Sequence, residues 1–225
     1  MSRYIDLGTD QASLAFRLRL PEDNQVAPIV MLHGLGGDEN VMWGLESALP
    51  QAGMVVAPRA PHEQRQGEYS WNPIIKAWPP LVSEFAEAVD LLESLLDYLE
   101  LQYAFRRDRM VLMGFSNGTA MSFAASMTPM SQSPAGIIAI SGHLPEGDLS
   151  PLRGIPVYWG HGTRDTFIPI DIARSDAERL RQAEVPVTFC EARVGHKLGA
   201  QCLDNLRRWL SVEFPVPEAR EERTP

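Results

Sequence analysis

Residues 109–125, RMVLMGFSNGTAMSFAA, contain the pattern that decides the fold. The segment opens with an apolar run, 110–113, short enough to be a buried strand, and closes with residues 119–125, which suit a helix. Between them lies Gly114-Phe115-Ser116-Asn117-Gly118, a G-x-S-x-G frame. Strand, sharp turn and helix in this order hold the serine in a strained conformation, with its hydroxyl clear of the sheet edge. The flanking glycines are needed because a Cβ at either position would collide where helix and strand meet.

The same residues allow a second interpretation, because Asn117-Gly118 is also a favoured hairpin turn. A hairpin requires a second strand of alternating apolar and polar residues after the turn. Residues 119–125 do not alternate cleanly. Ser116 is therefore the candidate nucleophile, and the rest of the chain tests it.

Length and charge restrict the class of protein. A chain of 225 residues fits one domain, expected over residues 1–212, and the biased segment 213–225 is expected to be a flexible tail. The net charge of −9 argues against a nucleic-acid partner. No apolar run is long enough for a membrane span, and the first residues lack the apolar segment of a signal peptide. Two cysteines, Cys190 and Cys202, are interpreted as reduced thiols of a cytoplasmic protein.

The order of apolar patterns predicts an α/β fold. Residues 13–20 alternate, as expected of a half-buried antiparallel edge strand. Further strands are expected at 27–32, 54–57, 110–113, 136–141, 156–160 and 187–190, and helices at 40–50, 81–101, 119–125, 168–183 and 198–210. Because strands and helices alternate along the chain, we expect a mainly parallel sheet with helices on both faces.

A glycine-rich loop, residues 33–38, follows the buried strand at 27–32. It lacks the glycine spacing and the lysine of a phosphate-binding loop. We expect it to supply an oxyanion-binding backbone N–H from Leu35, paired with the N–H of Asn117, although a tight structural turn is the open alternative. His33 is expected to hold the loop by hydrogen bonds rather than to act as a base.

A serine hydroxyl needs a base, and the base needs an orienting carboxylate. Ser116, Asp165 and His196 each follow a predicted strand, so a parallel sheet would gather them along one edge. His143 is the one serious competitor as base, and Asp148 and Asp171 are alternatives to the acid.

The long stretch 59–80 shows no clear period and holds several apolar residues. Such loops are often lids or substrate walls, and packing onto the body is an equal alternative. The candidate substrate-binding residues are Trp71, Ile74, Ile75, Trp78, Phe167 and Leu198.

The chain resembles the α/β-hydrolase group of small carboxylesterases, lysophospholipases and acyl-protein thioesterases over residues 27–210. The matching segments are HGLGGDE from His33, APRAP from Ala57, GFSNG from Gly114, SGHLP from Ser141, HGTRDTFIP from His161 and VGH from Val194. The resemblance implies cofactor-free hydrolysis of esters or thioesters and a body without a large cap domain. Asn117 stands where the family commonly has glutamine, and His143 where it often has another residue.

The leading hypothesis is a serine esterase or thioesterase that forms an acyl-enzyme on a small-molecule ester or acyl substrate. The alternatives are a relative that only binds an acyl ligand, or perhydrolase, peptidase or C–C hydrolase chemistry on the same triad. Metal-dependent hydrolysis is disfavoured, because no H-x-H or H-E-x-x-H spacing occurs. A monomer and a homodimer are equally compatible with the sequence.

Overall fold

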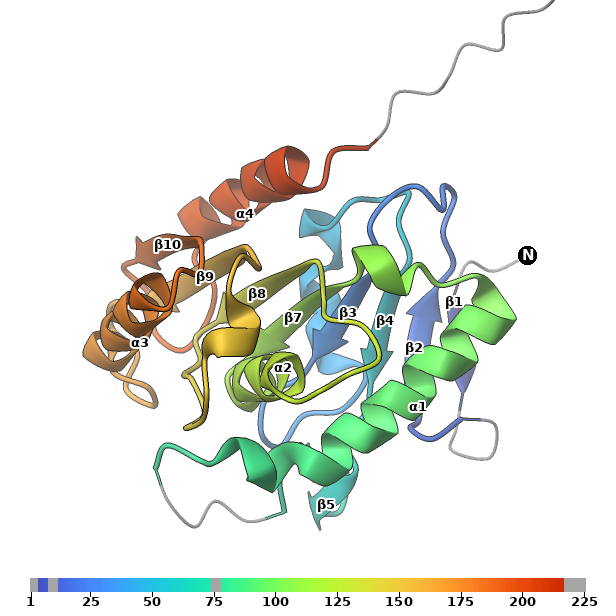
Figure 1. Ribbon diagram of the computed structural model, residues 1–225, viewed down its shortest axis with the longest axis horizontal. Helices are drawn as coiled ribbons and strands as arrows, with labels where there is room; N and C mark the ends of the chain where they lie inside the picture. The colour runs from blue at the N-terminus through green and yellow to red at the C-terminus, as the bar shows by residue number, and fades with distance from the viewer. Residues whose placement is uncertain (1–3, 8–11, 74–77, 217–225) are drawn as a thin grey trace, which may run out of the picture.

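The computed structural model describes residues 4–7, 12–73 and 78–216. Its centre is an eight-stranded sheet in the order β1-β2-β4-β3-β7-β8-β9-β10 (Figure 1). From β4 to β10 in this order the neighbours pair in parallel, whereas β2 is antiparallel to both β1 and β4. The strands of this sheet are β1 (Tyr4–Leu7), β2 (Phe16–Arg19), β3 (Ile29–Leu32), β4 (Val55–Pro58), β7 (Val111–Phe115), β8 (Gly136–Ile140), β9 (Val157–Gly162) and β10 (Val187–Ala192).

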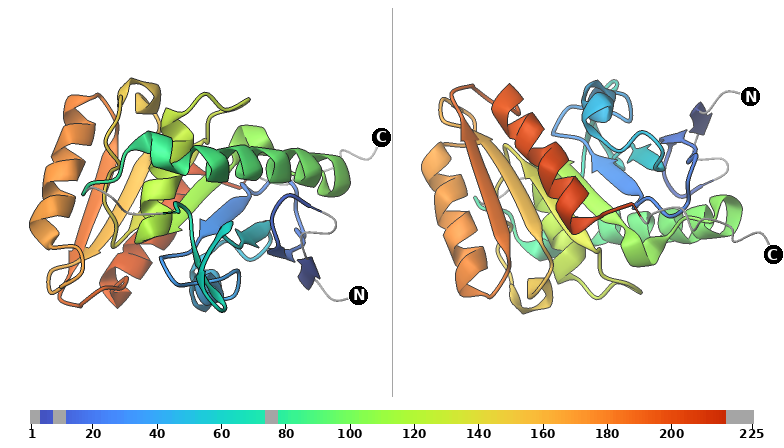
Figure 2. Two further views of the ribbon diagram at one scale, coloured as in Figure 1. Left: turned by 90° about the horizontal axis from the view of Figure 1, so that it is seen from below. Right: turned by 90° about the horizontal axis from the view of Figure 1, so that it is seen from above.

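Helices cover both faces of the sheet (Figure 2). The helices α1, α2 and α3 pack on one face, and α4 packs on the other face with the 3-10 helix η1. Their bounds are η1 (Val41–Ala48), η2 (Val82–Phe85), α1 (Ala86–Tyr103), η3 (Arg107–Arg109), α2 (Asn117–Met127), η4 (Ser150–Leu152), α3 (Ile170–Gln182) and α4 (Ala200–Glu213). In the described part of the chain, no helix has the length and apolar character needed to cross a membrane.

The predicted fold class is confirmed: the sheet is mainly parallel and helices lie on both of its faces. Strand β3 is buried along its whole length, because both faces of the sheet are covered there. Strand β2 is antiparallel as expected, but it is not the edge of the sheet, because β1 pairs along its outer side. The helix expected at 40–50 is the 3-10 helix η1.

The stretch 59–80 contains a small antiparallel hairpin that the sequence did not predict. Strands β5 (His62–Arg65) and β6 (Glu68–Ser70) form it. The residues of β5 are polar and mostly exposed, so they carry no alternating apolar signal that would mark a strand. The hairpin leads directly into Trp71, which is buried completely.

The prediction of two reduced thiols is wrong. Cys190 on β10 and Cys202 on α4 form a disulfide, with a Cα–Cα distance of 5.6 Å. Both residues belong to the core between the sheet and α4, so the packing of helix on strand brings their side chains together. Two cysteines twelve positions apart give no sign of this pairing in the sequence, because the pairing depends on how α4 folds back over β10.

Candidate active site

The turn after β7 has the strained geometry that its sequence predicts. Ser116 has φ 53° and ψ −114°, a conformation that costs a non-glycine residue free energy. A Cβ on Gly114 would lie 2.2 Å from the carbonyl oxygen of Gly118, and one on Gly118 would lie 1.9 Å from that of Leu32. Only glycine fits at either position. The turn therefore holds Ser116, half-buried, at the carboxyl end of β7 and at the start of α2.

His196 and Asp165 meet at the same edge of the sheet. His196 Nδ1 lies 2.7 Å from Asp165 Oδ2, and the Asp165 side chain is fully buried. The loop after β9 carries the aspartate, and the loop after β10 carries the histidine. The ring of Phe115, which precedes the serine, lies 4.9 Å from the His196 ring. The three predicted loops thus converge on one place.

The second oxygen of Asp165 is held by the backbone. Oδ1 accepts hydrogen bonds from the N–H groups of Phe167, at 2.9 Å, and Ile168, at 3.0 Å. These bonds fix the carboxylate so that Oδ2 faces His196. Charge-assisted bonds of this kind are stronger than bonds between neutral groups.

A second histidine, His161, lies against the same carboxylate, and sequence reasoning missed this contact. Its Nε2 lies 2.9 Å from the carbonyl oxygen of Ile168 and 3.5 Å from Asp165 Oδ2. Burial lowers the pKa of His161, with the hydrogen bond to Ile168 acting in the opposite direction. His161 is therefore a neutral donor beside the aspartate. The H-G-x-x-D spacing was the available signal, since both residues lie at one strand end.

The rival residues have other partners. His143 is buried, with its ring 4.2 Å from that of Trp78, and its Nδ1 lies 3.2 Å from the carbonyl oxygen of Leu144. Asp148 accepts hydrogen bonds from Ser150. Asp171 pairs with Arg174. Within the described part of the chain, neither rival acid forms a hydrogen bond or ion pair with a histidine, whereas Asp165 lies 2.7 Å from His196.

His33 holds the glycine-rich loop, as predicted. Its Nε2 accepts a hydrogen bond from the N–H of Ala60 at 3.0 Å, so Nδ1 carries the proton and donates to the carbonyl oxygen of Gly34 at 2.8 Å. Burial lowers the pKa of His33, which keeps the ring in this neutral form. A Cβ on Gly34 would lie 3.3 Å from Ser116 Cβ, so the loop reaches the nucleophile. Leu35 follows and its side chain is exposed.

The candidate substrate-binding residues lie in different environments. Trp71 has no exposed surface and packs in the core under α1 and α2. Leu198 is partly buried in the core under α4, beside Gly160. Trp78 and Phe167 are 51% and 78% exposed, and the Phe167 ring lies 5.1 Å from the His196 ring. Ile74 and Ile75 lie outside the described residues.

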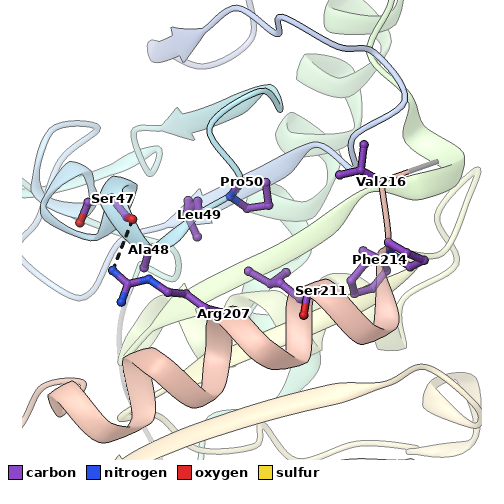
Figure 3. A pocket seen from close by; sticks show the side chains of 10 residues that line it. Ser47, Ala48, Leu49, Pro50, Arg207, Ser211, Phe214 and Val216 are labelled. Atoms are coloured by element: carbon purple, nitrogen blue, oxygen red, sulfur yellow. Dashed lines mark hydrogen bonds between the residues drawn. The ribbon is translucent and has the colours of Figure 1, made fainter. Parts of the chain in front are cut away.

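Two cavities lie at different distances from the edge of the sheet that carries Ser116, Asp165 and His196. One of about 420 Å³ lies between Trp78, His143 and α3, next to the loop that follows β8. A larger one, about 580 Å³, lies between the end of η1 and the last turn of α4 (Figure 3). Its wall includes Phe214, which packs near Gly136 at the amino end of β8, away from Ser116. Among the described residues, no histidine or carboxylate lines the larger cavity, so we assign it no part in the chemistry despite its size.

The mainly parallel sheet, the strained serine turn and the polar residues at the carboxyl ends of the strands are the features that define the class of α/β-hydrolases. Solved structures share this fold: a carboxylesterase from Bacillus cereus superposes with a TM-score of 0.80 at 20% identity, covering 92% of this chain and 97% of that one. A carboxylesterase from Mesorhizobium loti also gives 0.80, at 17% identity, covering 93% and 99%. At these identities the similarity establishes the fold alone.

The chain belongs to the phospholipase/carboxylesterase family, which it matches over residues 15–213. It is 28% identical over 201 residues to acyl-protein thioesterase 1 of Cryptococcus neoformans, a match that covers 80% of this chain and 79% of the relative. It is 29% identical over 168 residues to acyl-protein thioesterase 1 of Saccharomyces cerevisiae, covering 64% and 72%. The protein is therefore a carboxylic ester hydrolase, and esters and thioesters are the substrates of its class.

Proposed function

We propose that the protein hydrolyses carboxylic esters and thioesters through an acyl-enzyme on Ser116, with His196 as base and Asp165 as the orienting acid. The observation that carries this proposal is the 2.7 Å contact between His196 Nδ1 and Asp165 Oδ2 at the edge where Ser116 stands. Because Nδ1–H donates to the carboxylate, Nε2 is the nitrogen with a free lone pair. A hydroxyl near neutral pH needs such a base.

The reaction has two halves. Ser116 Oγ attacks the acyl carbon as His196 Nε2 takes the hydroxyl proton, and the same proton passes to the departing alkoxide or thiolate. Water then attacks the acyl-serine, giving its proton to Nε2, which returns it to Ser116 Oγ. Asp165 stabilises the imidazolium in both halves. The backbone N–H groups of Leu35 and Asn117 bind the oxyanion, where loss of one donor costs on the order of 10²–10³ in rate.

Two exposed aromatic residues, Phe167 and Trp78, indicate where the acyl or leaving group binds. Phe167 lies beside the His196 ring, and Trp78 borders the 420 Å³ cavity next to the loop after β8. Aromatic walls favour apolar chains. The names of the thioesterase relatives favour acyl thioesters as one substrate type. Trp71 is fully buried and Leu198 is partly buried in the core, so we assign the exposed wall to Phe167 and Trp78.

The test compares wild type with Ser116→Ala on p-nitrophenyl esters and acyl thioesters of increasing chain length. A fluorophosphonate probe reports whether the serine is nucleophilic. Ser122→Ala is the matched control, since Ser122 lies in α2, six residues after Ser116, and its buried hydroxyl donates to the Gly118 carbonyl. We expect loss of turnover and labelling in Ser116→Ala only. An active or labelled Ser116→Ala would refute the proposal.

The chain-length preference is tested separately with Trp78→Ala. We expect its preferred acyl length to shift, whereas Leu101→Ala, which removes an exposed apolar side chain on α1, keeps the wild-type preference. An unchanged preference in a folded Trp78→Ala would exclude this tryptophan from the pocket.

A further inference from the structure

The segment 69–72, at the end of the β5–β6 hairpin, lies between the glycine-rich loop and the serine turn. Its first residue, Tyr69, pairs with the glycine-rich loop through the backbone. The N–H of Gly36 donates to the carbonyl oxygen of Tyr69 at 2.9 Å, and the N–H of Tyr69 donates to that of Gly37 at 3.2 Å. The residues on the carboxyl side of Leu35 are therefore anchored to the hairpin.

Trp71 bonds to both sides. Its indole Nε1 donates to the carbonyl oxygen of His33 at 2.8 Å, at the start of the glycine-rich loop. Its backbone N–H donates to Asn117 Oδ1 at 3.1 Å, at the start of α2. All three residues are buried, so these hydrogen bonds are shielded from competing water.

Asn72 completes the connection. Its Oδ1 accepts a hydrogen bond from Asn117 Nδ2 at 2.9 Å, and its own side chain is 1% exposed. Both ends of the Asn117 amide are thus bound to the segment 69–72, through Trp71 and through Asn72. The side chain of Asn117 is occupied with this contact, and its backbone N–H lies directly after the nucleophile.

We infer that Trp71 and Asn72 are positioning residues, which set the distance between the two backbone donors of the oxyanion site, Leu35 N–H and Asn117 N–H. This inference rests on the proposed function. An oxyanion needs both donors at about 2.7–3.1 Å from one point, and misplacement by about 1 Å is costly. The two donors come from loops that follow different strands, β3 and β7. The segment 69–72 bonds to both loops, so it fixes their separation.

The experiment removes one hydrogen bond and keeps the ring. Trp71→Phe loses the bond to His33, whereas the matched control, Trp159→Phe, loses none, because Trp159 Nε1 is buried without a hydrogen-bond partner among the described residues. For each variant we measure kcat, KM and the inhibition constant of a trifluoromethyl ketone, which forms an oxyanion on the serine. In Trp71→Phe we expect kcat/KM and ketone affinity to fall together by about tenfold, with KM within about twofold of wild type. Trp159→Phe should change ketone affinity less than about twofold.

A second measurement covers the Asn72–Asn117 contact. Asn72→Ala and Asn117→Ala each keep the backbone N–H groups, and we expect the double variant to lose no more ketone affinity than the worse single variant. Additive losses would overturn the inference, as would a Trp71→Phe that is less stable but retains wild-type ketone affinity. These outcomes leave the proposed function intact as long as wild type is active and labelled at Ser116. An inactive, unlabelled wild type would instead refute the proposed function itself.

Discussion

Gly162 and Gly195 approach so closely that a Cβ on Gly162 would lie 2.1 Å from the carbonyl oxygen of Gly195. Gly162 ends β9, three residues before Asp165, and Gly195 directly precedes His196. Two backbone hydrogen bonds join the same loops, from Thr163 N–H to Ala192 O at 2.8 Å and from Arg164 N–H to Val194 O at 2.9 Å. The 2.7 Å contact between acid and base depends on this close approach.

Gly162→Ala should therefore impair activity. The added methyl group has no room and must push the His196 loop away from β9. We expect kcat/KM to fall by about 100-fold, because small misplacements of a catalytic group carry penalties of that order. Gly44→Ala is the control, since a Cβ there meets no atom within 4 Å. The measurement is kcat/KM of both variants and wild type on a short ester. Full activity in Gly162→Ala would mean that the two loops can separate without loss of catalysis.

Asp165→Asn should lower kcat by about 10⁴, because an amide favours the wrong tautomer of the base. The backbone bonds from Phe167 and Ile168 give the asparagine a fixed place, so the fold is expected to survive, as circular dichroism would show. Asp204→Asn serves as the comparison. Its carboxylate is exposed, pairs with Arg207 and does not line the 420 Å³ cavity, so we expect near wild-type turnover. Equal losses in the two variants would remove Asp165 from its proposed role.

The stability of the protein should fall on acidification, in part through His143. Burial lowers the pKa of His143 to about 4, with the hydrogen bond to Leu144 acting in the opposite direction. As the pH falls below about 6.5, His143 becomes protonated in the unfolded chain but stays neutral in the folded protein, so the free energy of unfolding falls. This loss levels off below about pH 4, where His143 is protonated in both states. The contribution across this window is about 3 kcal/mol. Stability due to the neutral ring is thus present at pH 7 and lost by pH 4.

Urea unfolding at pH 7 and pH 4.5 measures this effect. The free energy of unfolding should fall between these pH values in both proteins. We expect the fall in His143→Gln to be smaller than the fall in wild type by about 2–3 kcal/mol. His33 and His161, whose pKa values burial also lowers, remain in both proteins, so their contributions cancel in the comparison. An identical pH dependence would show that His143 titrates normally.

The disulfide should stabilise the fold around the base. Cys190 and Cys202 flank the loop that carries His196, and closing a loop of this size contributes about 3 kcal/mol in the chain-entropy account. Dithiothreitol should therefore lower the free energy of unfolding of wild type by about 2–3 kcal/mol. The Cys190→Ala/Cys202→Ala double variant should show no response to the reductant. Two titratable thiols in the non-reduced, denatured protein would contradict the pairing.

Local patterns in the sequence were sufficient to predict those parts of the structure that depend on residues close together in the chain. Buried runs such as 110–113 predicted the strands, and the G-x-S-x-G frame predicted the turn, because glycine is needed wherever helix and strand nearly touch. The meeting of His196 with Asp165 was also predictable, since carboxyl ends of parallel strands lie along one edge. The hairpin was not, because polar exposed strands have no periodic signal.

By itself, the sequence determined the α/β class, the strained serine turn and the strand ends from which the three polar side chains extend, because these depend on periodicity and on residues adjacent in the chain. Only the tertiary structure decided that Trp71 lies in the core and bonds to two loops, that His161 lies beside the carboxylate of Asp165, and that Cys190 faces Cys202. Each of these contacts joins residues whose meeting depends on how helices and hairpins pack over the sheet. That packing is settled by the burial of many side chains together, which no short stretch of sequence records.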